Sequence, residues 1–370
     1  MIDRGLEQQE NMANNQAQSV QEINSGTRPI DPSRGIDMER LGRWLKANID
    51  GFDALTEIRE FKGGQSNPTF QLVTPTRKYV LRSKPAGASA SAHAVEREYR
   101  LMSAVGKVGF PVAQAYALCE DEGVIGSVFF VMEMVEGRIL WDGSLPDLTP
   151  AERGAVYRSQ IETLARLHSI DHVAVGLGDY GKSGNYYERQ IHRWIKQYRS
   201  TEGERIEPME RLIEWLPKTV PHQDRTTLLH GDFRIDNMVL HATEPRVRAV
   251  LDWELSTLGD PLADLSYFLL GWVMPRDRHL PLCEIGDLPA YGIPTLDQAI
   301  AQYCSLVKRD DVPDLNWYFA FNFFRLAGIS HGIGMRAKAG TAANDHAASR
   351  AARAPMLAAL GCSFAEKAGI

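Results

Sequence analysis

A short polar stretch between two apolar runs determines how this sequence is interpreted. The stretch is His230-Gly231-Asp232-Phe233-Arg234-Ile235-Asp236-Asn237, with apolar residues at 228–229 before it and at 238–240 after it. A further apolar run at 247–251 ends in Asp252-Trp253-Glu254. Short apolar runs bounded by polar loops are typical of buried strands. We therefore expect three short strands here, with Asp232, Asn237 and Asp252 at their ends.

These three residue types suit the transfer of a phosphoryl group to a hydroxyl group. Such a transfer needs a carboxylate that orients the hydroxyl and takes its proton, and oxygen ligands that hold Mg²⁺ against the ATP phosphates. Asp232 can act as the carboxylate, and Asn237 and Asp252 can act as the ligands. An aspartate, an asparagine five residues later and an aspartate after the next strand is the kinase pattern. His-Gly-Asp alone more often marks a turn with capping aspartates, but the joint spacing favours the catalytic interpretation.

The sequence on the two sides of this stretch predicts two lobes. Strands are expected at 58–61, 69–73, 79–82 and 127–135, with a helix at 92–105. A helix capped by Asp37 and ended by Gly51 precedes them, and Thr149, with Glu152 at capping-box spacing, begins a mostly helical region. Further helices are expected from about Pro261, Leu296 and Leu315.

The predicted organisation is an α+β fold with a small antiparallel-sheet lobe and a larger helical lobe. Residues 1–30 are polar and lack hydrophobic periodicity, so they are expected to form a disordered tail. Residues 31–135 are assigned to an N-terminal ATP-binding lobe. Residues 136–370 are assigned to a C-terminal lobe that carries the catalytic residues and binds the acceptor.

Composition narrows the function classes. The 370 residues are 44% hydrophobic and 24% charged, with a net charge of −6 and no long basic block, so no nucleic-acid partner is expected. None of the four cysteines stands at C-x-x-C spacing, which indicates free thiols in a reducing compartment. Without an apolar leader or a run of eighteen apolar residues, a membrane partner is not expected and the predicted location is the cytoplasm.

The motifs resemble those of the aminoglycoside phosphotransferase and choline kinase-like family. The family's H-G-D-x-x-x-x-N matches residues 230–237, its I-D-W-E matches 251–254, and 259–265 resembles the segment that follows. The resemblance runs from about Phe61 to Gly340. It implies a protein-kinase-like two-lobed fold that uses ATP and Mg²⁺.

The resemblance also implies roles in the first lobe. A loop of Gly63, Gly64, Gln65 and Ser66 would close over the ATP phosphates, although an ordinary hairpin loop fits the composition as well. The family's phosphate-anchoring lysine falls on Arg82, which keeps the charge but differs in reach. Lys84, two residues on, is the alternative anchor.

Three further residues take roles from the same resemblance. Glu98 is the expected ion-pair partner of Arg82, although its position also suits a solvated helix face. Glu133 and Val135 are the expected hinge residues, whose backbone carbonyl and amide would bind adenine; a buried strand entering a turn explains them equally.

His230 and Asp264 are interpreted as braces of the loop and not as ligands.

Within the family, residues 79–85, 91–98 and 323–327 look like the kinase-like domain found fused to acyl-CoA dehydrogenases. This likeness implies a hydroxyacyl-CoA acceptor and a functional link to an acyl-CoA dehydrogenase. From 315 to 365 the only acid is Asp345, and Arg325 and Arg336 are spaced to share one helical face. We expect these two arginines to meet the phosphates of CoA; pairing with acids or exposure to water is the alternative.

Three other functions remain open on the sequence alone. An aminoglycoside- or choline-type kinase would use the same catalytic residues on another acceptor. A non-catalytic ATP-binding pseudokinase is suggested by the arginine at position 82. A metal-dependent hydrolase could use His230, Asp232 and Asp252, but it lacks further close ligands.

Overall fold

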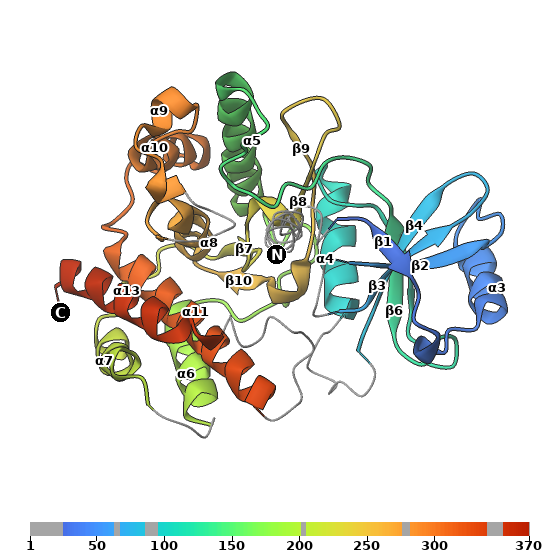
Figure 1. Cartoon of the computed structure of the whole chain (residues 1–370), viewed down its shortest axis with the longest axis horizontal. Coiled ribbons are helices and arrows are strands. Elements are labelled where there is room, and N and C mark those ends of the chain that lie inside the picture. The colour runs from blue at the N-terminus through green and yellow to red at the C-terminus, as the bar shows by residue number, and fades with distance from the viewer. Residues whose placement is uncertain are drawn as a thin grey trace, which may run out of the picture.

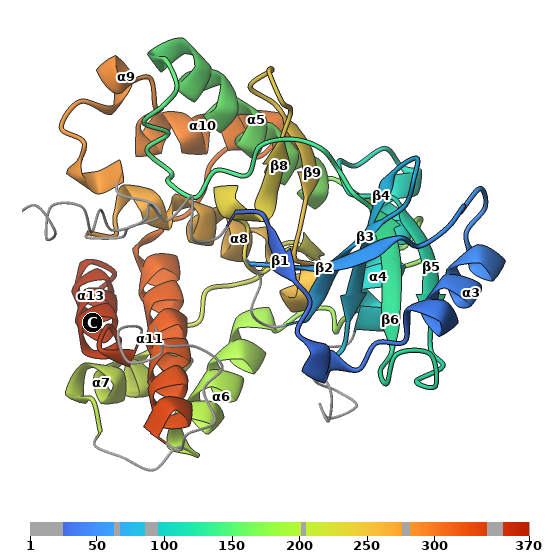
Figure 2. The same ribbon diagram turned by 45° about the vertical axis from the view of Figure 1, so that its right-hand side comes forward.

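The computed structural model describes residues 25–62, 67–85, 95–200, 205–275, 282–338 and 351–369, except for the side chains of 336–338. The chain forms a sheet lobe and a helical lobe, as the sequence predicts (Figure 1). Their elements meet where the strand pairs of the second lobe approach the sheet of the first (Figure 2).

The first lobe is built on a six-stranded antiparallel sheet in the order β1-β2-β3-β4-β6-β5. Its strands are β1 (Thr27–Pro29), β2 (Glu57–Phe61), β3 (Thr69–Val73), β4 (Lys78–Ser83), β5 (Ala115–Cys119) and β6 (Phe129–Glu133). Two helices complete the lobe, α3 (Met38–Asn48) and α4 (Val95–Lys107).

Alternating side chains give this sheet two buried faces. Leu81 and Val131 belong to the apolar cluster that includes Leu41 and Leu45 of α3. Val80, which precedes Leu81 on β4, belongs with α4 and the second lobe to the larger cluster. The period of two along β4 therefore places α3 and α4 on opposite faces of the sheet.

The structure corrects the expected boundary of the N-terminal tail. Thr27–Pro29, within the segment expected to be disordered, forms β1 and pairs with β2. Backbone pairing and the ion pair between Arg28 and Glu60, at 2.9 Å, hold this strand on the sheet. Because these contacts are polar, no hydrophobic pattern marks the strand in the sequence. Asp37 caps α3 as expected, but the helix ends at Asn48, before Gly51.

The second lobe is mostly helical. Its helices are α5 (Pro150–His168), α6 (Tyr186–Arg199), α7 (Glu207–Trp215), α8 (Pro261–Phe268), α9 (Leu288–Tyr291), α10 (Leu296–Val307), α11 (Asn316–Lys338) and α13 (Ala354–Lys367). The predicted capping box of Thr149 and Glu152 begins α5. In the part of the chain that the structure describes, no helix has the length and hydropathy of a membrane-spanning segment.

Two strand pairs in this lobe carry the polar motif. β7 (Thr227–Leu229) pairs with β10 (Thr257–Gly259), and β8 (Met238–Leu240) pairs with β9 (Val247–Val250). The register Met238↔Val250 places the residue before β8 and the residues after β9 at one end of the hairpin. The three predicted strands are confirmed, and the fourth, β10, was missed.

Candidate active site

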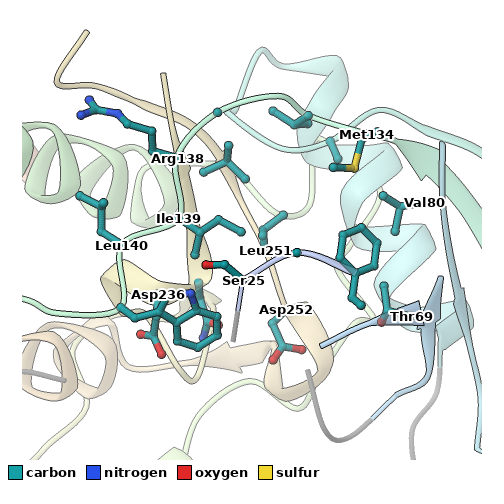
Figure 3. Close-up of a pocket in the computed structure, with 18 of the residues that line it drawn as sticks. Ser25, Thr69, Val80, Met134, Arg138, Ile139, Leu140, Asp236, Leu251 and Asp252 are labelled. Atoms are coloured by element: carbon teal, nitrogen blue, oxygen red, sulfur yellow. The ribbon is translucent and has the colours of Figure 1, made fainter. Parts of the chain in front are cut away.

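A cavity of about 1220 Å³ lies between the two lobes. Val80 and Thr69 of the sheet form one wall, and Leu251 and Asp252, which follow β9, form another (Figure 3). The connection between the lobes contributes Met134 and the stretch from Arg138 to Leu140 (Figure 3). The cavity thus combines an apolar interior with a polar end at Asn237 and Asp252.

Arg82 is a buried cation in the lining of this cavity. It lies at the end of β4, is only 8% exposed, and its Nε stands 3.1 Å from the Glu98 carboxylate on α4. Its Nη2 contacts the carboxylate of Asp252 and lies 3.6 Å from that of Glu254. The expected pair with Glu98 is present, and Arg82 also joins the sheet lobe to the loop that follows β9.

The three acids around Arg82 influence its pKa, and two of them influence the pKa of the third, Glu98. Burial is the largest influence and raises the pKa of Glu98 to about 7, against the attraction of Arg82; Asp252 and Glu254 add to the rise. Burial would lower the pKa of Arg82, but the three carboxylates raise it above its ordinary value. Asn67 Nδ2 donates a 2.9 Å bond to Glu98 and helps to fix that carboxylate.

Asp232 lies in the loop after β7, half-buried and bonded through both carboxylate oxygens. Tyr267 of α8 donates its hydroxyl to Oδ1 at 2.5 Å, and Asn237 donates its Nδ2 to Oδ2 at 2.9 Å. Burial opposes ionisation, but the charge of Arg234 and the bond from Tyr267 lower the pKa of Asp232 below its ordinary value. The group is therefore a carboxylate at neutral pH.

The loop that carries Asp232 is braced from beneath by Asp264 of α8. Its carboxylate accepts from the backbone N–H of His230 at 2.6 Å and of Gly231 at 2.8 Å. The ring of His230 donates Nε2–H to the carbonyl of Leu251 and accepts from Asp232 N–H at Nδ1. Both interpretations as braces are confirmed, and the ring links the two polar loops.

Backbone geometry explains two residues of the motif. Gly231 has a φ of 85°, and a Cβ there would lie 2.7 Å from the carbonyl oxygen of Leu255. Asp252 also has a positive φ, 62°, which is uncommon for a residue with a side chain and concentrates at functional sites.

The polar end of the cavity suits a hard divalent cation. Asn237 uses its Nδ2 for two bonds to Asp232, so its Oδ1 is the atom that could bind a cation. The carboxylate of Asp252, 32% exposed, stands at the same end of the β8–β9 hairpin. One carboxylate and one amide oxygen, with phosphates to complete the shell, fit the preferences of Mg²⁺.

The remaining predicted nucleotide residues fall in several places. Glu133, the last residue of β6, and Val135 both line the cavity, and Glu133 N–H donates to the carbonyl of Gln114 at 2.8 Å. Lys84 is described but does not line the cavity, unlike Arg82. Gly63, Gly64, Gln65 and Ser66 lie outside the described residues.

Arg325 does not fit the predicted CoA-binding face. It is only 8% exposed on α11, and its guanidinium donates to the carbonyl of Gly231 at 2.5 Å. The same group lies over the ring of Tyr267, 5.1 Å from its centroid. Helical spacing shows which residues share a face but not what covers that face, so the burial of Arg325 could not be predicted from the sequence. The side chain of Arg336 lies outside the described part.

Sequence reasoning missed two residues of the site, Tyr267 and Glu254. A signal for Tyr267 existed, because it follows Asp264 by three residues in α8 and so shares its face. Glu254 belongs to the quoted Asp-Trp-Glu motif but was given no role. Its contact with Arg82 depends on the lobes coming together, which no local pattern encodes.

Relatives of known sequence match most of the chain. Mouse acyl-CoA dehydrogenase family member 10 is 41% identical over 348 residues, 93% of this chain and 32% of that protein. Human family member 11 is 41% identical over 310 residues, 82% of this chain and 40% of that protein. The chain thus spans about a third to two fifths of these relatives' length.

Solved structures share the fold. A Ralstonia eutropha protein, provisionally described as an aminoglycoside phosphotransferase, is 46% identical, with a TM-score of 0.81, covering 90% of this chain and 98% of that one. A spectinomycin phosphotransferase solved with ADP and spectinomycin has a TM-score of 0.58 at 12% identity, covering 89% and 99%. The model of the phosphotransferase enzyme family matches residues 57–292. The chain belongs to this phosphotransferase family and has its kinase-like fold.

Proposed function

We propose that the protein is an ATP- and Mg²⁺-dependent kinase that phosphorylates a hydroxyl group of a small anionic molecule, a hydroxyacyl-CoA. One observation carries the kinase proposal above the others. The Asp232 carboxylate is held one hydrogen bond from Asn237, and Asn237 and Asp252 stand together at the polar end of the cavity. This arrangement separates a proton acceptor from a cation site while keeping them adjacent.

The bond changes follow from these positions. The acceptor oxygen forms a bond to the γ-phosphorus of ATP, the bond from that phosphorus to the bridging oxygen breaks, and ADP leaves with the electron pair. The hydroxyl proton passes to Asp232, whose lowered pKa keeps it ionised beforehand. When bound at Asn237 and Asp252, Mg²⁺ would offset the charge of the phosphates.

Arg82 is assigned to the phosphates as well. Its guanidinium contacts Asp252, the residue proposed to hold the cation. Arg82 would bind a phosphate through its guanidinium, with its Nε held by Glu98. Glu133 and Val135 are proposed to bind adenine at the opposite end of the cavity.

The other candidate functions have less support. A hydrolase would need His230 as a metal ligand, but both of its ring nitrogens are used in backbone hydrogen bonds. A pseudokinase would be favoured if Arg82 did not line the nucleotide cavity. Arg82 does line the cavity, and it pairs with Glu98 on α4.

The acceptor is proposed from the relatives and not from the cavity. Proteins described as acyl-CoA dehydrogenase family members match this chain at 41% identity over 310 to 348 residues, across a region about as long as the chain itself. A kinase segment within such a protein is best explained by a shared acyl-CoA metabolite. We therefore propose a hydroxyacyl-CoA acceptor and a functional link to an acyl-CoA dehydrogenase.

A screen of acceptors tests this proposal. ADP release would be measured with MgATP and, in parallel, hydroxyacyl-CoAs, the matching free hydroxy acids, choline and aminoglycosides. We expect turnover with the thioesters and little with the other compounds. Turnover of aminoglycosides or choline alone would refute the acceptor, and equal rates on thioester and free acid would remove CoA recognition.

A further inference from the structure

Tyr267 and Arg325 form a stack beneath the loop that carries Asp232. Tyr267, 6% exposed on α8, donates its hydroxyl to Asp232 Oδ1 at 2.5 Å. The guanidinium of Arg325, from α11, lies over the tyrosine ring at 5.1 Å and donates to the carbonyl of Gly231 at 2.5 Å. Two helices that are distant in sequence thus converge on one side of a single loop.

We infer that Tyr267 is a positioning residue for Asp232, and that Arg325 holds both the tyrosine ring and the loop in place. The inference rests on the proposed kinase function, since it assigns the tyrosine to the proton acceptor of that reaction. It also gives Arg325 a role in place of the predicted contact with CoA.

Two hydrogen bonds from different elements fix the plane of the Asp232 carboxylate. Tyr267 occupies one lone pair of Oδ1, and Asn237 occupies one lone pair of Oδ2. Each carboxylate oxygen has a second lone pair, so either can still accept the proton of a hydroxyl. Fixed orientation before the reaction is what a proton acceptor requires, because misplacement costs rate and not only affinity.

The polar and charged groups around Asp232 come from three elements. His230 and Arg234 belong to its own loop, Tyr267 comes from α8 and Arg325 from α11. Tyr267 contacts the carboxylate itself, and Arg325 contacts the tyrosine ring and the loop backbone. Loss of the tyrosine hydroxyl should therefore free the carboxylate to turn.

A substitution of Tyr267→Phe tests the first half of the inference. We expect kcat to fall about tenfold at neutral pH with an unchanged KM for MgATP, because the carboxylate loses a bond that orients it. Tyr198→Phe on α6 is the control, since it removes another buried hydroxyl, which accepts from Ile206 N–H at 2.8 Å. The control should lower the melting temperature and leave kcat unchanged.

Crystal structures of the natural protein and of Tyr267→Phe give a result that does not depend on turnover. The Asp232 carboxylate should keep its bonded orientation in the natural protein and turn in the variant. An unmoved carboxylate with an unchanged kcat would overturn the inference even if the enzyme is a kinase. A turned carboxylate in a protein that phosphorylates no acceptor would instead refute the proposed function alone.

Arg325 is tested with Arg325→Met and Arg325→Lys. As a positioning residue, Arg325→Met should lower kcat about tenfold for every acceptor, and Arg325→Lys, which keeps a donor but not the planar stack, should recover part of it. If Arg325 bound CoA, Arg325→Met would raise KM for the thioester and leave the free acid unaffected, which would overturn the inference.

Discussion

Arg82 is the residue that three acidic side chains of the site surround. Its guanidinium contacts carboxylates from α4 and from the loop after β9, and these residues lie 16 and 170 positions away in sequence. This arginine offsets the negative charge of acids that would otherwise repel phosphates. The contact with Arg82 keeps the Asp252 carboxylate beside the cavity. The backbone of Asp252 is in the left-handed conformation.

Replacing Asp232 should separate catalysis from binding. In Asp232→Asn the side chain can no longer take the hydroxyl proton, so we expect kcat to fall by about 100-fold or more. The affinity for MgATP should be unchanged, because Asp232 does not line the nucleotide cavity. Steady-state kinetics with calorimetry would check both parts, and wild-type kcat would remove Asp232 from its role.

The two proposed metal ligands should contribute unequally to the affinity for MgATP. Asp252→Ala removes a charge and an oxygen, so MgATP affinity should fall by about tenfold or more, whereas Asn237→Ala should cost about threefold. Calorimetry with and without Mg²⁺ would measure this, and the affinity for metal-free ATP serves as the control. Equal MgATP affinity in Asp252→Ala and in the unaltered protein would defeat the assignment.

Arg82 and Lys84 provide a matched pair. Arg82→Ala should weaken ATP binding by about tenfold, because a charge in contact with phosphate is lost, while Lys84→Ala should have little effect. Arg82 lines the cavity and Lys84 does not. Nucleotide titrations of both variants would decide, and the reverse ranking would move the anchor to Lys84.

At the scale of elements, the contact of β4 with α4 carries a buried carboxylate with a raised pKa. Glu98 should bind a proton in the folded protein up to about pH 7, whereas its ordinary value is 4.5. A raised folded pKa favours folding fully below the ordinary value, and this contribution disappears as pH rises through the folded value.

Glu98→Gln should therefore change the pH dependence of stability. Between about pH 5 and pH 7 the free energy of unfolding of the natural protein should lose a contribution of up to about 3 kcal/mol that the glutamine variant retains. Urea unfolding of the two proteins across this range would measure the difference. Parallel curves for both proteins would show that Glu98 does not titrate there.

Elements with local signals could be predicted from the sequence, and those without could not. Capping residues and apolar runs placed α3, α5 and the β8–β9 hairpin because these signals act over a few residues. β10 is only Thr257–Gly259 and contains a glycine, so its pairing with β7 provides the only evidence for it. In the site, the Asp232 spacing was local, whereas Tyr267 and Arg325 reach it through tertiary packing.

At the scale of the whole molecule, α4 is fastened to the second lobe. Arg97 lies over the ring of Tyr180 at 4.2 Å and donates to its backbone carbonyl at 2.8 Å. The Tyr180 hydroxyl bonds to Ser256 at 2.5 Å, just beyond the loop that contains Asp252. This chain of contacts relates Glu98 on α4 to the proposed cation site without passing through the cavity.

Removing the contacts between Arg97 and Tyr180 should weaken the binding of MgATP. Arg97→Ala should raise KM for MgATP about two- to fivefold, because a cation–π contact and a hydrogen bond are lost. Arg100→Ala is the control on the same helix, since its pair with Asp179 is exposed and contributes little. If both variants give the natural KM, then the position of α4 does not depend on Arg97.

We propose that Asp232 directs a phosphoryl group from ATP to a hydroxyl of an acyl-CoA. The most direct measurement follows the label from γ-³²P-ATP with Mg²⁺ and a hydroxyacyl-CoA, for the natural protein and for Asp232→Asn side by side. We predict labelled acyl-CoA from the natural protein and almost none from the variant. Label that appears only as inorganic phosphate, or equally in both acyl-CoA products, would contradict it.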